Sequence, residues 1–140
     1  GRQQRDQATG GWMNGIPTRW RTTFREQLAD ARQRLESAEQ QLKGGNGGRA
    51  LQAAYPAVVA AATIRVWLTD PPWQRALQAN EMQRRVREAF PNRFGALAVL
   101  DLRDVLTSPW TVDAAGPYVG EARSFVDQIQ AELEQCLGQD

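Results

Sequence analysis

Residues 49–69, RALQAAYPAVVAAATIRVWLT, decide the fold because apolar side chains occur on every face of a helix drawn through them. A helix without a polar face is buried at the centre of a protein. Gln52, Pro56 and Arg65 interrupt the run and make it a poor membrane span. The sequence therefore predicts a buried central helix and no membrane partner. Pro56 is expected to kink this helix or to restrict its regular part to the residues that follow.

An amphipathic helix precedes this run. Thr23 and Glu26 have the spacing of a capping box, and glycines at 44, 45, 47 and 48 end the pattern. The apolar stripe between them alternates steps of four and three residues: Phe24, Leu28, Ala31, Leu35, Ala38 and Leu42. This stripe fits a coiled-coil seam between two chains or packing within one chain, and its few repeats favour the second.

Three further helices are predicted after the central one. Asp70 and Pro71 are typical of a helix start, and this helix extends to Phe90 with a bend or break near Asn80. A helix over residues 94–106 and a closing helix over residues 118–137 follow. We expect an all-α fold, an antiparallel bundle of about five helices, with residues 22–140 as its single domain.

Residues 1–21 are rich in arginine, glutamine and glycine and are expected to form an N-terminal arm. Trp12 and Trp20 are the candidate partner-binding residues, because tryptophans with an exposed edge often anchor protein contacts. Two alternatives stay open. The arm lays its tryptophans on the bundle or on a partner, or it is flexible.

Charge is sorted along the chain. Residues 1–34 carry a net charge of +4, residues 35–94 one of +3, and residues 95–140 one of −6. This pattern fits an anion-binding face or helices that pair through complementary surfaces, and the second is favoured. Arg65, the charged residue of the central helix, is expected to pair with a carboxylate of a neighbouring helix rather than to serve as a buried functional arginine.

A local basic group is the candidate site for nucleic acid or another anion. It consists of Arg84, Arg85, Arg87 and Arg93. Several arginines on one surface bind phosphates without any catalytic residue. The alternative is a solvated helix face whose cations complement the helix dipole.

The chemistry available to the chain is narrow. It has no histidine and a single cysteine, Cys136, which excludes His-based nucleophile activation and intramolecular disulfides. Cys136 is expected to be a packing thiol. Asp101 and Asp104, one helical turn apart, are the candidate ligands for the alternative of a divergent metal-dependent enzyme. We therefore expect a non-enzymatic protein with no cofactor and no bound metal. Cysteine usage and the absence of a signal-peptide pattern favour the cytoplasm.

Residues 54–62, AYPAVVAAA, follow a long amphipathic helix and a glycine turn, and they resemble the A-Y-Y-A-x-F-x-A-A helix of HEPN (higher eukaryotes and prokaryotes nucleotide-binding) domains. Pro56 replaces the second aromatic residue of that pattern. Ribonucleases of the family carry an arginine followed four to six residues later by histidine. Arg103 lies in the corresponding region, but no histidine follows it. The resemblance therefore implies a non-catalytic, dimerising or partner-binding helical module of a prokaryotic nucleic-acid-related or defence system, such as a toxin–antitoxin pair.

A second functional class is a small helical subunit of a CRISPR effector complex that contacts the RNA or DNA backbone through arginines. The size and arginine content of the chain are compatible with it. The two classes differ in salt dependence, because phosphate contacts weaken steeply as salt rises and apolar protein contacts do not.

Overall fold

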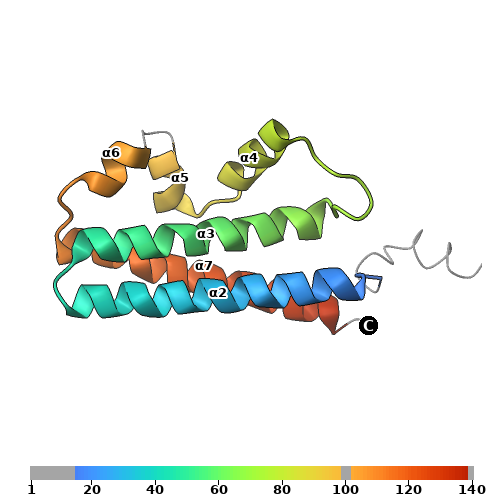
Figure 1. Ribbon diagram of the computed structural model, residues 1–140, viewed down its shortest axis with the longest axis horizontal. Coiled ribbons are helices and arrows are strands. Elements are labelled where there is room, and N and C mark those ends of the chain that lie inside the picture. The colour runs from blue at the N-terminus through green and yellow to red at the C-terminus, as the bar shows by residue number, and fades with distance from the viewer. Residues whose placement is uncertain (1–14, 99–101, 139–140) are drawn as a thin grey trace, which may run out of the picture.

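The computed structural model describes residues 15–98 and 102–138, which form helices and no strand (Figure 1). The helices are α2 (Thr18–Lys43), α3 (Gly47–Thr69), α4 (Ala79–Glu88), α5 (Asn92–Ala98), α6 (Leu102–Thr107) and α7 (Val112–Leu137). The predicted all-α class is confirmed. The described residues hold six helices, and two of these, α5 and α6, fall in the region where one helix was expected over residues 94–106.

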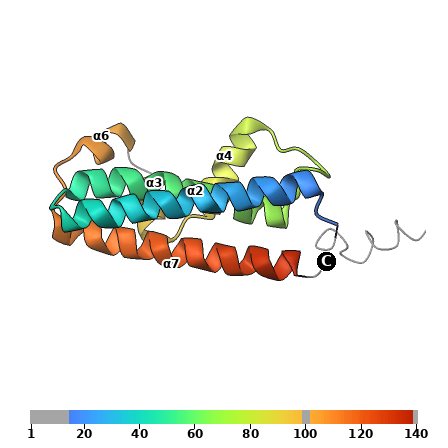
Figure 2. The ribbon, with the colours of Figure 1, turned by 60° about the horizontal axis from the view of Figure 1, so that its bottom comes forward.

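Three long helices form the bundle, and three short ones lie along one side of it. Helix α2 runs antiparallel to α3 and to α7, and the segment that contains α4, α5 and α6 carries the chain back along α3 (Figures 1 and 2). Helix α3 contacts α2, α4, α6 and α7. It is therefore the central helix that its all-round apolar character predicts.

The stripe on α2 packs within the chain. Phe24, Ala31, Leu35 and Ala38 are fully buried, and Leu28 is nearly so. The intramolecular interpretation is thus confirmed. The predicted helix start is wrong, since α2 begins at Thr18 and the Thr23 hydroxyl donates to the Arg19 carbonyl oxygen. Packing of Trp20 against other aromatic rings stabilises the additional first turn.

Pro56 does not restrict the regular helix to the residues that follow it, because α3 is continuous from Gly47 to Thr69 around it. Proline removes one hydrogen bond of the helix. Four residues on the two sides of Pro56, Ala50, Leu51, Ala61 and Ala62, are fully buried, and this packing holds the helix together. By length and composition α3 is the one helix of the described chain that could also cross a membrane.

Two further helix starts differ from the prediction. Asp70 does not cap a helix; it ends α3, its carboxylate pairs with Arg75 and Arg85, and α4 begins only at Ala79. Helix α7 begins at Val112, six residues earlier than expected, because the Thr111 hydroxyl accepts a hydrogen bond from the Ala114 amide. The two guanidinium partners of Asp70 outweigh the helix-start signal at Pro71. The cap at Thr111 starts α7 ahead of Pro117, which lies inside that helix.

The sorted charges pair the helices. Arg32 of α2 lies 2.9 Å from Asp127 of α7, and Arg65 of α3 lies 2.7 Å from Glu132 of α7. The α7 residue Arg123 in turn binds Glu39 of α2 at 2.7 Å, and the hydrogen bond to Glu39 raises the Arg123 pKa. The preferred interpretation of the charge pattern, including the pairing of Arg65, is confirmed.

These bridges are expected to contribute little stability. The Arg65 and Glu132 side chains are 31% and 39% exposed, and solvent screens such pairs to about 1 kcal/mol or less. Arg65→Ala also loses the contact of its guanidinium with the Phe125 ring, 5.3 Å from the ring centre. A double-mutant cycle with Glu132→Ala in urea unfolding measures the coupling. A coupling energy above about 2 kcal/mol would contradict the screened pair.

Candidate binding groove

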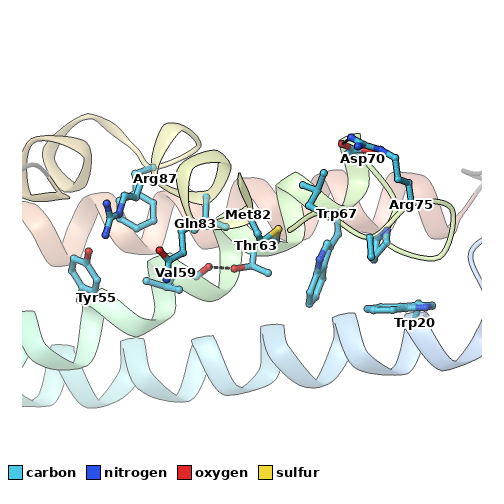
Figure 3. A pocket seen from close by; sticks show the side chains of 15 residues that line it. Trp20, Tyr55, Val59, Thr63, Trp67, Asp70, Arg75, Met82, Gln83 and Arg87 are labelled. Carbon is cyan, nitrogen blue, oxygen red and sulfur yellow. Dashed lines mark hydrogen bonds and ion pairs between the residues drawn. The ribbon is translucent and has the colours of Figure 1, made fainter. Parts of the chain in front are cut away.

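A groove with a volume of about 470 Å³ lies between α3 and the segment that follows it; we call it the α3–α4 groove (Figure 3). One wall comes from α3, where Tyr55, Val59, Thr63 and Trp67 recur at every fourth position and so share one face. The facing wall comes from residues 70–90, including Met82 and Val86. The volume lies within the range of sites that hold a small molecule or a few side chains of a partner.

The local sequence explains why this space is open. Residues 71–78 form no helix, and α4 contributes ten residues against the 23 of α3. The short helix therefore covers only part of the α3 face that α2 and α7 leave uncovered. Tyr55, Val59 and Trp67 consequently stay half-buried.

One end of the groove is built from aromatic rings. Trp20 lies 5.3 Å from Trp67 and 5.8 Å from Trp73 between ring centres, and buried Phe24 lies 5.8 Å from Trp67. The Trp20 Nε1 donor is buried and has no hydrogen-bond partner in the described chain. The structure thus places Trp20 at the wall of the groove, within its own chain. Trp12, the other predicted partner-binding residue, lies outside the described residues.

The opposite end combines a phenol with a guanidinium. Tyr55 and Arg87 both line this end, and the Tyr55 ring lies 5.8 Å from that of Phe90 (Figure 3). Burial raises the Tyr55 pKa, and the Arg87 charge partly offsets this by lowering it. The phenol is therefore protonated at neutral pH. Its hydroxyl makes no hydrogen bond within the described residues and is available as a donor.

The four arginines predicted as one anion site do not all come together: Arg84 and Arg87 line one pocket beside α4, and Arg85 and Arg93 do not line it. Arg84 pairs with Glu88 at 3.2 Å, Arg85 with Asp70 at 3.2 Å, and Arg93 with Glu121 of α7 at 3.4 Å. Arg87 alone of the four has no carboxylate within ion-pair distance in the part of the chain that is described. It is also the one that lines the α3–α4 groove.

The structure describes one of the two candidate metal ligands and the cysteine. Asp104 is exposed on α6, and Asp101 lies outside the described residues. Within those residues no three His, Cys, Asp or Glu side chains gather as metal ligands. Cys136 is buried, and burial together with Glu132 raises its pKa, so its thiol is a packing group.

The groove itself was not predicted. Its one sequence signal is that residues 55, 59, 63 and 67 follow one another at intervals of four. Because the helix is apolar on every side, this face cannot be distinguished from the others in the sequence. The non-helical segment between α3 and α4 opens the groove. The sequence did not predict this segment, because Pro71 indicated a helix start there. No family model, curated protein or solved structure matches this chain, so the ligand of the groove has to be argued from its own residues.

Proposed function

We propose that this chain is a non-catalytic helical binding module that acts through protein–protein contact, with the α3–α4 groove as the surface that receives the partner. One observation carries the proposal: an apolar groove with Trp20, Tyr55, Trp67 and Arg87 in its walls. Tryptophan, tyrosine and arginine are the residues that most often supply binding energy at protein interfaces. Exposed apolar surface of this kind marks interaction sites.

The rest of the scaffold supports this choice of surface. Apart from Ala29, the exposed positions of α2 are polar or charged. Ion pairs join α2 and α3 to α7, so the charges between these helices have partners within the bundle. The buried core between the long helices fixes the position of the α3 wall. The resemblance of residues 54–62 to a HEPN helix adds to the proposal a place in a prokaryotic nucleic-acid-related or defence system, as a partner-binding relative without ribonuclease activity.

The test is selection of a random-peptide display library on the whole chain. We expect the wild-type chain to retain peptides that variants with a filled groove do not retain. Val59→Trp fills the groove from α3, and Met82→Trp fills it from the facing wall. The matched control is Gln128→Trp, which adds the same ring to an exposed position of α7 outside the groove. Circular dichroism checks that all three variants are folded.

Peptides retained equally by wild type and by both filled variants would contradict the proposal. Nucleic acid is the competing partner, and a salt titration with single-stranded RNA and DNA measures it by fluorescence anisotropy. We expect no binding that falls steeply with salt, because ion pairs engage Arg84, Arg85 and Arg93. Nucleic-acid binding that falls steeply with salt, and that the triple variant Arg84→Ala/Arg85→Ala/Arg87→Ala no longer shows, would favour the nucleic-acid function instead.

A further inference from the structure

We propose that the partner segment in the α3–α4 groove is apolar and acidic: it places bulky apolar side chains against the tryptophan end and an Asp or Glu carboxylate against Arg87 and Tyr55. This inference rests on the proposed function and adds the chemistry of the partner. It follows from the polar groups of the groove that have no hydrogen-bond or ion-pair partner among the described residues.

The available groups are mainly hydrogen-bond donors. The Tyr55 hydroxyl has no hydrogen-bond partner and the Arg87 guanidinium faces no carboxylate in the described chain. Trp20 Nε1–H also has no partner there, but it is buried inside the wall, so the tryptophan end offers an occupant apolar ring surface. The Thr63 hydroxyl already donates to the Val59 carbonyl oxygen at 2.8 Å. An occupant that brings acceptor oxygens to Tyr55 and Arg87 therefore gains hydrogen bonds, and the bond to the guanidinium is charge-assisted.

The charge of the groove points the same way. Its charged lining residues are Asp70, Arg75 and Arg87. Asp70 binds Arg75 at 3.1 Å and also Arg85 at 3.2 Å, so two guanidiniums already offset this one carboxylate. The lining therefore carries a net charge of +1, which comes from Arg87 at the Tyr55 end, while Arg75 and Asp70 offset each other at the tryptophan end. An acidic, apolar segment complements it, and a basic segment would be repelled.

The chain itself is a poor source of that segment. Residues 1–14 contain two arginines and one carboxylate, Asp6, so their charge has the same sign as that of the groove. The acidic helix α7 is packed into the bundle, with Phe125, Val126, Ile129 and Leu133 buried. A separate protein is thus the occupant that the charges favour.

The experiment compares the peptides selected by the wild-type chain with those selected by Arg87→Glu. We expect wild-type peptides to combine aromatic or large aliphatic residues with Asp or Glu. On Arg87→Glu, Lys or Arg should replace the acid while the apolar residues remain. For one selected peptide, Arg87→Ala should weaken binding by about tenfold, as expected for loss of a charge-assisted hydrogen bond. Quenching or shift of tryptophan emission measures this affinity, because Trp20 and Trp67 line the groove.

The matched control is Arg84→Ala, which removes the same charge one turn earlier on α4 from a residue paired with Glu88. It should change the affinity by about twofold at most. Groove-dependent peptides without an acid, or peptides that bind Arg87→Ala as tightly as wild type, would overturn this inference and leave the proposed function standing. No groove-dependent peptide at all would overturn both. Two further outcomes would also overturn the inference. If decanoate displaces the peptide at an equal concentration, the groove binds a free fatty acid. If the chain is a dimer that Val59→Trp dissociates, the groove binds a second copy of the chain.

Discussion

Replacing Gly47 with alanine will lower the free energy of unfolding by about 3 kcal/mol, an effect typical of severe overpacking. Gly47 is buried at the start of α3, where a Cβ would lie 2.5 Å from the Thr111 carbonyl oxygen and would also clash with the Trp110 carbonyl oxygen. Both obstacles are backbone atoms, so no side-chain rotation relieves the clash. The cost is the displacement of residues 110–111, which would weaken the Thr111 cap of α7 and the hydrogen bond from Trp110 Nε1 to the Val105 carbonyl oxygen.

The adjacent glycine is the matched control. At Gly48 an added Cβ meets only the Ser108 carbonyl oxygen at 3.9 Å, an ordinary contact. Gly48→Ala should therefore raise the free energy of unfolding by about 0.5 kcal/mol, because alanine restricts the unfolded chain more than glycine does. Urea unfolding followed by circular dichroism measures both variants. Equal stability of the two would contradict the close approach of the α2–α3 turn to the start of α7.

The helices that were predicted correctly are those whose sequence pattern and packing agree. The stripe from Phe24 to Ala38 is buried as expected, and the apolar run of 49–69 is the central helix. Helix ends were predicted less well, because local signals compete with distant partners. The cap expected at Asp70 fails since Arg75 and Arg85 bind its carboxylate, and Arg85 is fifteen positions away in the sequence. Such a partner cannot be identified before the chain is folded.

The candidate site shows the same limit. The sequence identified Arg84, Arg85, Arg87 and Arg93 as a group, but it could not tell which of them a carboxylate engages. Glu121 reaches Arg93 from α7, while Arg87 is left facing Tyr55 in the groove. Trp20 was identified for its type and position, yet its neighbours Trp67 and Trp73 come from α3 and from the segment after it. The groove is a product of tertiary packing, and only its α3 wall has a signature in the sequence.

Replacing Phe24 with alanine will have the other large effect, a loss of about 4 kcal/mol in the free energy of unfolding. Phe24 is fully buried, and its ring centre lies 6.3 Å from Trp20, 5.8 Å from Trp67 and 6.1 Å from Trp73. Truncation leaves a cavity beneath these tryptophans and removes their ring contacts. Urea unfolding measures the loss, and a value below about 1 kcal/mol would contradict this packing.

Leu35→Ala separates the support of the groove from general stability. Leu35 is equally buried on the same stripe of α2, about three turns along the helix from Phe24 and from the tryptophan end. Both substitutions should destabilise the bundle by several kcal/mol. Only Phe24→Ala should shift native tryptophan emission to longer wavelength, because water then reaches Trp20 and Trp67. If Leu35→Ala shifts the emission equally, the tryptophan end of the groove depends on the bundle as a whole and not on Phe24 beneath it.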